Sequence, residues 1–444
     1  MTRLFGTDGV RGVANVELSP ELALALARAA AAALLPAGGH VIVGRDTRTS
    51  GPMLEAALAA GFASAGVDAS LAGIIPTPAI SFLIKDEGAD LGAVLSASHN
   101  PPEDNGIKFF SRTGQKLTVE EEEEVESALD APREAARERR VGRIETLDVA
   151  ATRYAAFLTG TIEGADVDLS GLTLVVDCAY GATGSIAPRV FRHLGARVIE
   201  LHAAADGARI NVDCGSTHLE AVRAAVLRER ADLGVAFDGD GDRVLLVSSQ
   251  GQTIDGDQMI GIVAAHRLAR GNFYPALVVG TILSNFGLEK FLAERGIGMV
   301  RTPVGDRHVA QAMLANGARI GGEPSGHIIF ADHAPTGDGI LTVVQLLEIA
   351  HDAGKSVEEL ARGIALYPQS QENVACPTAE KARSIPLDDV ARRAEAKLGG
   401  RGRAVLRPSG TQPMVRVFVE AEDAHLADAV CQAAAAEIAG LVAR

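Results

Sequence analysis

Three stretches of the chain repeat one order of apolar and polar residues. Each begins with a β-branched apolar run and a polar turn, at residues 40–51, 172–184 and 275–287. Each continues through a helix-like stretch to a second apolar run, and then to a third whose exit carries polar residues. Strands that alternate with helices are typical of α/β units with largely parallel sheets. The letters ADLG, shared by 89–92 and 231–234, favour a true repeat over a merely similar composition.

The repeat predicts an α/β protein of three similar domains whose sheets are mixed and largely parallel. After about residue 368 it gives way to strand-like runs at 403–406 and 415–420 and an Ala-rich helix from about 424, which indicate a smaller C-terminal α+β domain. We expect four domains: 1–153, 154–255, 256–368 and 369–444. Chemistry in such folds collects beyond the carboxyl ends of the strands, so we expect three exit loops to meet around a central cleft: 96–100, 238–243 and 323–327.

A charged stretch lies between the first two expected domains. Thr118 and Glu121 have the spacing of a helix capping box. The acidic run 120–124 indicates a solvated face of that helix, and we assign it no function.

The composition excludes some functions and leaves others open. With 444 residues, 47% of them hydrophobic, the chain can bury several cores. A formal net charge of −15 argues against a nucleic-acid or anionic membrane partner, so an anionic substrate would need a local cluster of Arg and Lys. The four cysteines are far apart and fit a reducing compartment, with Cys178 and Cys431 as core residues. Because no signal-peptide pattern and no run of about 18 apolar residues occurs, we expect a cytoplasmic protein without a membrane segment.

Three aspartates, Asp238, Asp240 and Asp242, alternate with glycines directly after an apolar strand. Alternate residues of an extended loop point the same way, so the carboxylates would repel one another unless a cation neutralises them. Hard oxygen ligands favour Mg²⁺. An EF-hand calcium loop is excluded, because its sixth position has Arg243 and its twelfth has Ser249. A solvated acidic turn is the alternative, and the position at a strand end favours the metal site.

Ser96 and Ser98 follow the strand of the first repeat. The chain has no nucleophile elbow, Walker loop or dinucleotide fingerprint in the required context. Neighbouring residues of an extended chain point opposite ways, so His99 is a poor base for Ser98. A hydroxyl close to metal-binding carboxylates suits phosphoryl transfer instead. Without that context, both serines would be interpreted as turn formers or helix caps.

Five motifs follow one another along the chain. They are FGTDGVRG (5–12), SASHNPPEDNGIKF (96–109), DGDGDR (238–243), GEPSGH (322–327) and RPSGTQP (407–413). With these motifs the chain resembles the α-D-phosphohexomutase superfamily and, within it, the bacterial phosphoglucosamine mutases, over essentially its whole length. The resemblance implies that Ser98 is phosphorylated in the working enzyme, and that this phosphate and the three aspartates hold one Mg²⁺. It also implies a hexosamine or hexose 1,6-bisphosphate as primer.

The resemblance also implies roles for the GEPSGH loop. Glu323 and Ser325 would contact sugar hydroxyls; the competing interpretation is an ordinary Pro-Ser-Gly turn. His327 would contact the sugar or move a proton, although isolated histidines are often structural. The loop has Pro324 where this family commonly has Gln, which predicts a stiffer loop.

Several basic residues are candidates for binding anions. Hydroxyls, backbone N–H groups and guanidiniums of the RPSGTQP turn can form a phosphate cradle, in which Gln412 replaces the usual Glu. The tight GTDGVRG loop would carry Arg11 toward the phosphoserine, and Arg243 would serve the same anion. Arg45 and Arg48 either join them or are surface ion pairs. The cradle residues are Arg407, Ser409, Gly410, Thr411 and Arg416.

Lys108 lies between apolar residues in the strand that follows the Pro101-Pro102 turn. Partial burial would lower its pKa and allow proton transfer, whereas a snorkelling lysine would keep its charge in water.

The resemblance implies an enzyme that interconverts glucosamine 6-phosphate and glucosamine 1-phosphate through a phosphoserine and a bisphosphorylated sugar, toward UDP-N-acetylglucosamine and cell-wall precursors. The same chemistry on mannose or glucose phosphates is one alternative. A sugar-phosphate phosphatase or binding protein is another, from a different class. The only partner expected besides the sugar phosphate is a second copy in a possible homodimer.

Overall fold

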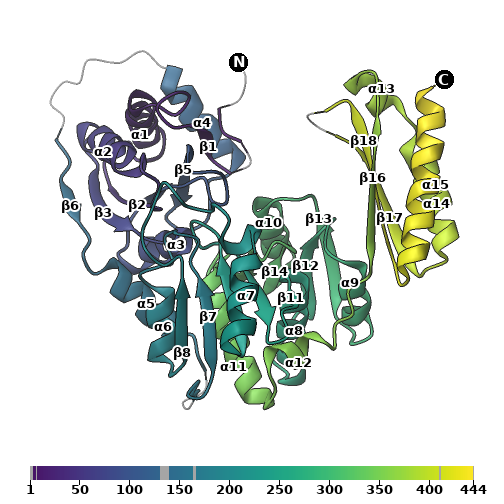
Figure 1. Ribbon diagram of the computed structural model, residues 1–444. Helices are drawn as coiled ribbons and strands as arrows, with labels where there is room; N and C mark the ends of the chain where they lie inside the picture. The colour runs from purple at the N-terminus through teal and green to yellow at the C-terminus, as the bar shows by residue number, and fades with distance from the viewer. Residues whose placement is uncertain (1–3, 7, 131–139, 164–166, 410–411, 444) are drawn as a thin grey trace.

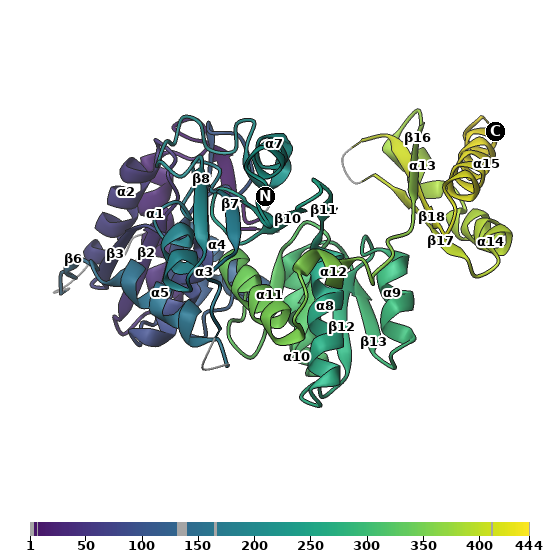
Figure 2. The ribbon, with the colours of Figure 1, turned by 60° about the horizontal axis from the view of Figure 1, so that its bottom comes forward.

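The computed structural model describes residues 4–6, 8–130, 140–163, 167–409 and 412–443. These residues form four sheets in chain order, each with its own helices. Figures 1 and 2 show the units side by side along the molecule, with the C-terminal unit at the far end from the first.

The first sheet has six strands in the order β1-β5-β4-β2-β3-β6. Strands β2, β3, β4 and β6 run parallel, and β5 joins β4 and β1 antiparallel. The strands are β1 (Val10–Val13), β2 (His40–Arg45), β3 (Asp68–Ile74), β4 (Leu91–Leu95), β5 (Asp104–Ser111) and β6 (Ile144–Thr146). The helices are α1 (Pro20–Leu34), α2 (Gly51–Ser64), α3 (Thr77–Asp86) and α4 (Val119–Asp130).

The second sheet has the order β11-β10-β9-β7-β8, and the third has β13-β12-β14-β15. The second comprises β7 (Thr173–Asp177), β8 (Arg197–Leu201), β9 (Leu233–Phe237), β10 (Val244–Ser248) and β11 (Thr253–Ile254), with α5 (Ala150–Gly160), α6 (Ala187–His193), η1 (Gly215–Thr217) and α7 (Glu220–Glu229). The third comprises β12 (Leu277–Thr281), β13 (Gly298–Thr302), β14 (Ile320–Gly322) and β15 (Ile328–Phe330). Its helices are α8 (Gly256–Ala269), α9 (Phe286–Ala293), α10 (Asp306–Asn316), α11 (Gly339–Ala353) and α12 (Val357–Ala361).

These three sheets share one plan, as the sequence repeat predicts. In each, a central strand pairs in parallel with the next two strands of the chain: β2 with β3 and β4, β7 with β8 and β9, and β12 with β13 and β14. In each, the third of these strands then pairs antiparallel with its successor, β5, β10 or β15. The predicted exit loops are the connections into these antiparallel strands, and they occupy equivalent places in the three units.

The C-terminal unit has a different plan and a separate core. Its sheet is antiparallel, in the order β16-β18-β17, and none of its residues belongs to the core that the first three units share. Arg403 of β17 donates hydrogen bonds to the carbonyls of Ile282 (2.9 Å) and Ser284 (2.7 Å) of the third unit, and Lys290 pairs with Glu422 at 3.2 Å. The elements are β16 (Gln369–Ala375), α13 (Ala379–Ser384), α14 (Leu387–Leu398), β17 (Gly402–Pro408), β18 (Met414–Ala421) and α15 (Ala424–Val442).

Smaller predictions meet mixed outcomes. The capping box is confirmed, because Thr118 and Glu121 each accept the other's backbone N–H, at 3.2 and 2.8 Å. Cys178 and Cys431 are buried, as expected. The prediction that residues 120–124 form a solvated helix face is wrong for Glu122, which is buried and pairs with Arg307 of the third unit. A run of charged residues does not show which of its side chains a distant unit will cover. Within the described ranges, no helix is long and apolar enough to cross a membrane.

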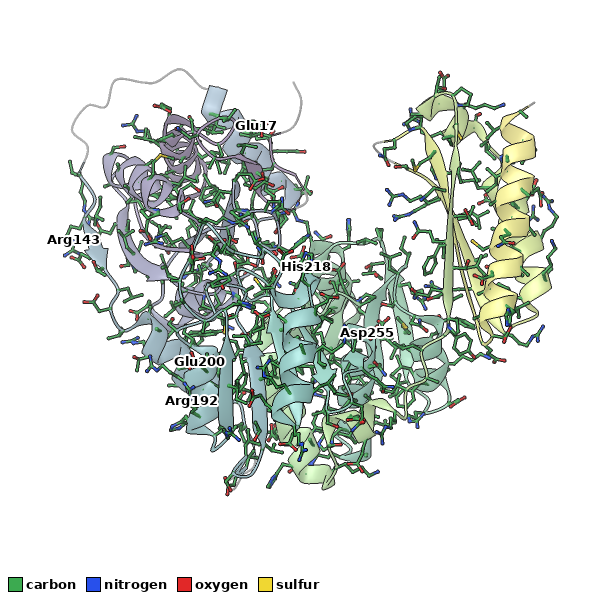
Figure 3. The ribbon with its side chains drawn as sticks, viewed as in Figure 1. Glu17, Arg143, Arg192, Glu200, His218 and Asp255 are labelled. Atoms are coloured by element: carbon green, nitrogen blue, oxygen red, sulfur yellow. The ribbon has the colours of Figure 1, made fainter. Side chains whose placement is uncertain are left out.

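The start of α8 contains a buried carboxyl group with a raised pKa. Asp255, labelled in Figure 3, caps the helix by accepting the N–H of Gln258 at 3.0 Å. Asp257 accepts the N–H of Asn285 at 2.6 Å, but its other carboxyl oxygen is buried without a partner. Burial, and then the nearby Asp255, raise the pKa of Asp257 to about 8. The folded chain therefore holds a proton there that the unfolded chain releases near pH 4.

We expect Asp257→Asn to weaken the pH dependence of stability. In the native chain the protonated Asp257 carboxyl contributes fully to stability below about pH 4. This contribution to the free energy of unfolding, roughly 2 kcal/mol or more, is lost as the pH rises toward 8. Asparagine resembles the protonated acid. The melting temperature of the variant, measured by calorimetry between pH 5 and 8.5, should therefore fall less steeply with rising pH than that of the native chain. Asp232→Asn, at an exposed carboxylate, is the control, and equal slopes in all three proteins would contradict the expectation.

Candidate active site

The serine loop begins where β4 ends. Ser98 has a left-handed backbone, with φ of 52°, and its N–H donates to Ser96 Oγ at 2.9 Å. Ser96 Oγ donates in turn to Asp46 Oδ2 at 2.6 Å. Ser98 is buried, and its Oγ donates to Asp238 Oδ2 at 2.6 Å. The structure thus brings the candidate nucleophile to the first aspartate of the second unit.

The three aspartates occupy the turn between β9 and β10. One carboxyl oxygen from each of Asp238, Asp240 and Asp242 lies within 4.8 Å of the others, and all three residues are buried. Burial first, and then mutual repulsion, raise the pKa of Asp238 well above its usual value and also raise that of Asp242. Asp240 Oδ1 and Asp242 Oδ1 are buried without a hydrogen-bond partner. Oxygens that are unpaired and mutually repelling fit a hard divalent cation.

Lys108 of β5 reaches the same aspartates, but its charge state differs from our expectation. Its Nζ lies 3.0 Å from Asp240 Oδ2 and 3.1 Å from Asp8 Oδ2. Burial disfavours its charge, but the carboxylates of Asp240, Asp8 and Asp242 outweigh burial and raise the pKa of Lys108 well above its usual value. The expected lowering is wrong, because the flanking apolar residues show the burial but not the carboxylates contributed by other segments. The snorkelling alternative fails too, since the side chain is buried.

His99 lies closer to Ser98 than expected. Its Nδ1 is 3.4 Å from Ser98 Oγ, at the outer limit of a hydrogen bond. The prediction that the two side chains diverge assumed an extended backbone, and the left-handed conformation of Ser98 removes that assumption. Burial, and then the charges of Arg243 and Arg11, lower the pKa of His99 to about 4, so the ring is neutral at neutral pH.

Arginines surround the serine and the aspartates. Arg11 of β1 donates to the Asn100 side chain at 3.3 Å, which places it at the serine loop. Arg243 donates its backbone N–H to Asp238 Oδ1 at 3.2 Å, and its Nε is buried without a hydrogen-bond partner, 3.9 Å from Asp242 Oδ1. Arg45 pairs with Glu55 at 3.2 Å, whereas Arg48 is wholly buried and is not a surface residue.

The GEPSGH loop joins β14 to β15 and packs on the aspartate turn. Glu323 accepts the N–H of Gly305 at 2.9 Å and the hydroxyl of Ser325 at 3.4 Å. Val244, directly after the aspartate turn, donates its N–H to Gly326 O at 3.2 Å. His327 is buried, and neither ring nitrogen has a hydrogen-bond partner; its Nε2 lies 3.9 Å from Asp242 Oδ2. The three exit loops therefore converge, as expected.

The predicted phosphate cradle lies in the C-terminal unit. Arg407 of β17 and Arg416 of β18 face each other in register, and Ser409 Oγ accepts the N–H of Gln412 at 3.3 Å. Gly410 and Thr411 lie outside the described residues. Among the residues that are described, no hydrogen bond or ion pair joins either arginine to the three loops. In Figure 1, the end of β17 and the start of β18, on either side of residues 410–411, lie on the side of the C-terminal unit that faces the first unit.

Comparison with known proteins decides the family. Sequence models of the phosphoglucomutase/phosphomannomutase family match nearly the whole chain. The α/β/α domain I matches residues 2–136, domain II 152–251, domain III 255–367 and the C-terminal domain 372–437. The chain belongs to the phosphoglucomutase/phosphomannomutase family. The four matches follow one another in the order of the four sheets.

Members of this family share much of the sequence and fold. A phosphoglucosamine mutase of Desulforamulus reducens is 48% identical, covering 95% of this chain and 96% of its own. One of Pelotomaculum thermopropionicum is 50% identical, covering 95% of each chain. A solved phosphoglucomutase/phosphomannomutase family protein of Burkholderia thailandensis, 29% identical, has a TM-score of 0.82 and covers 99% of this chain and 98% of that one.

The structure brings to the site three residues that the sequence analysis missed. Asp8 pairs with both Lys108 and Lys116, and Lys116 also pairs with Asp306 of the third unit. Thr77, at the start of α3, donates to Asp240 Oδ2 at 2.6 Å. Asp8 lies within FGTDGVRG, so its motif was a usable signal, whereas Lys116 and Thr77 lie in segments without a recognisable pattern.

Proposed function

We propose that the chain is a phosphoglucosamine mutase, an isomerase that interconverts glucosamine 6-phosphate and glucosamine 1-phosphate by intramolecular phosphotransfer. The observation that carries the proposal is the 2.6 Å contact between Ser98 Oγ and Asp238, within a buried group of three carboxylates. The relatives that share 48% and 50% of its residues bear the name phosphoglucosamine mutase. In cells the product would lead toward UDP-N-acetylglucosamine and cell-wall precursors.

In the proposed reaction, phospho-Ser98 transfers its phosphoryl group to O1 of glucosamine 6-phosphate. The Oγ–P bond breaks, a P–O1 bond forms, and O1 loses its proton. The bisphosphate then turns around. Ser98 Oγ attacks its 6-phosphoryl group, so that an Oγ–P bond forms, the P–O6 bond breaks, and O6 takes up the proton released from O1, leaving the 1-phosphate. When bound by the phosphoserine and the three aspartates, Mg²⁺ supplies positive charge beside the phosphoryl oxygens. A glucosamine or hexose 1,6-bisphosphate primes the first turnover.

The side chains have separate tasks in this proposal. Lys108 stays protonated and stabilises the negative charge that develops on Ser98 Oγ, together with Arg11. Glu323 and Ser325 bind sugar hydroxyls. His327, whose ring nitrogens have no hydrogen-bond partner, accepts the proton of O1, and neutral His99 is the second candidate acceptor.

The non-reacting phosphate would be held at the other end of the sugar. We assign this task to Arg407, Ser409 and Arg416, with Gly410 and Thr411, and the anion near the serine to Arg243. Domains at 1–153, 154–255, 256–368 and 369–444 then each contribute one part of the site. A homodimer and a cytoplasmic location remain predictions.

Comparing substrates tests the proposal. The chain, with Ser98 phosphorylation measured by intact mass and site mapping, would be assayed on the 6-phosphates of glucosamine, glucose and mannose. We expect glucosamine 6-phosphate to give the highest kcat/KM. Preference for glucose or mannose phosphate would overturn the substrate assignment. Release of inorganic phosphate instead of isomerisation would indicate a phosphatase, and binding without turnover would indicate a binding protein.

A further inference from the structure

Two carbonyl groups of the serine loop are held from two different units. The Ser98 carbonyl accepts from Arg48 Nη2 at 3.1 Å and from Asn211 Nδ2 at 2.9 Å. The Asn100 carbonyl accepts from the same two nitrogens, at 2.8 and 3.1 Å. A carbonyl oxygen has two lone pairs, so both carbonyls are saturated by these two side chains.

Every N–H group of the Arg48 guanidinium donates either to a carbonyl of residues 98–104 or to Asp46, which also accepts from Ser96. Nε pairs with Asp46 Oδ2 at 3.0 Å, and Nη1 donates to the carbonyls of Asp104, at 2.8 Å, and Pro101. With the two bonds from Nη2, all five N–H donors have partners, although the side chain is wholly buried. Four of the five bind carbonyls of residues 98–104, so Arg48 fixes the path of the backbone there.

Asn211 approaches from the second unit, on the loop between β8 and η1. Its φ is 61°, and Ala179, whose carbonyl accepts the Asn211 N–H at 3.0 Å, also has a positive φ of 52°. Asparagine tolerates this left-handed conformation better than most residues, but it still costs free energy. His218, labelled in Figure 3, lies directly after η1 and lines a surface hollow together with His99 and Asn211.

The two side chains together stabilise an unfavourable backbone conformation. Ser98 itself has a φ of 52°, which a serine adopts only when its surroundings impose it. Its Oγ direction toward Asp238 depends on that φ, since rotation about the N–Cα bond of Ser98 moves its carbonyl and its side chain together. The aspartate turn is packed against the same place, because a Cβ at Gly239 would lie 2.8 Å from the Ser98 carbonyl oxygen.

We propose that Arg48 and Asn211 are positioning residues that clamp the Ser98 and Asn100 carbonyls and so hold the phosphoserine in line for transfer. The inference rests on the proposed phosphoserine route. Asn211 belongs to the second unit. The phosphoryl group on Ser98 is therefore oriented for transfer only when the first two units are packed together. The sugar contacts lie in the third unit, so loss of the clamp misaligns the transfer without weakening substrate binding.

Asn211→Gly and Asn211→Asp test the clamp. Glycine accepts the φ of 61° without strain and removes both donors. Aspartate keeps the shape but replaces the NH₂ group with an oxygen that faces two carbonyl oxygens. We expect kcat to fall about 10- to 100-fold with glycine, and further with aspartate, while KM stays within about twofold. The ³¹P resonance of phospho-Ser98 should shift or broaden in both.

Arg230→Gly is the matched control, because Arg230 also has a positive φ, of 52°, but ends α7 away from the serine loop. It should leave kcat and the ³¹P signal unchanged. Arg48→Lys is a second, independent variant that keeps a positive charge beside Asp46 but loses the fork of donors. It should lower kcat in the same way, with KM again unchanged.

Wild-type kcat and an unshifted ³¹P signal in Asn211→Gly would overturn the clamp. A rise in KM with unchanged kcat would overturn it too, because it would place Asn211 in substrate binding. A wild-type enzyme that isomerises the sugar without any phosphoserine signal would instead overturn the proposed function, so the two failures can be told apart.

Discussion

Ser98→Ala is expected to lower kcat for isomerisation by about 10⁴-fold or more, because the proposed route carries the phosphoryl group on the Ser98 hydroxyl. The melting temperature should stay within a few degrees of the native value, since Ser98 Oγ makes its short hydrogen bond to an aspartate that is already crowded by two others. Coupled-assay turnover on glucosamine 6-phosphate, with calorimetry on the same preparations, measures both quantities.

Ser64→Ala is the matched control for this substitution. Ser64 lies at the end of α2, away from the serine loop, and its hydroxyl donates to Gly61 O and accepts from Arg28. The control should isomerise the sugar at the native rate. Near-native turnover by Ser98→Ala would refute a phosphoserine route.

Asp242→Asn is expected to lower kcat on the order of 10²-fold or more and to weaken Mg²⁺ binding. Asp242 is the best of the three aspartates to change, because Asp238 also holds Ser98, and Asp240 also holds Lys108 and Thr77. In the native chain, a saturating cation should raise the melting temperature, because binding at 100 times its Kd adds about 2.7 kcal/mol of stability. The variant should show a much smaller rise at the same concentration.

A chelator supplies a second measurement on the same proteins. Native activity should be lost in excess EDTA and return with added Mg²⁺, whereas Asp242→Asn should need far more Mg²⁺ to regain its residual rate. Asp232→Asn, on the exposed surface of the same unit, should behave as the native chain does. Equal Mg²⁺ effects on the melting temperatures of native and variant protein would rule out Asp242 as a ligand.

The repeated fold could be predicted because its signals are local. Each apolar run, turn and helix-like stretch is visible in a short window, and the order of the three windows places the exit loops at equivalent sheet edges. The motifs then predicted Ser98, the three aspartates and Glu323 as site residues, and the structure brings their loops together. The antiparallel strands β5, β10 and β15, which close each unit after its exit loop, were not placed individually, since their partners lie in the tertiary structure.

The electrostatics of the site could not be predicted from the sequence. The pKa of Lys108 depends on Asp8 and Asp240, which are 100 and 132 residues away from it in the chain. The ion pairs of Glu122 with Arg307 and of Lys116 with Asp306 join the first unit to the third. Such pairs form only when the units pack together. The pattern of apolar and polar residues along the chain does not show which surfaces of the units will be in contact.

The third unit and the C-terminal unit are joined by polar contacts: Arg403 with backbone carbonyls, and Lys290 and Tyr367 with Glu422. Their buried apolar residues belong to separate clusters, so we expect the C-terminal unit to move outward without unfolding either core. If Arg407 and Arg416 hold the non-reacting phosphate as proposed, the C-terminal unit would exchange one phosphate for the other without opening a packed core, and we expect that movement to depend on salt concentration.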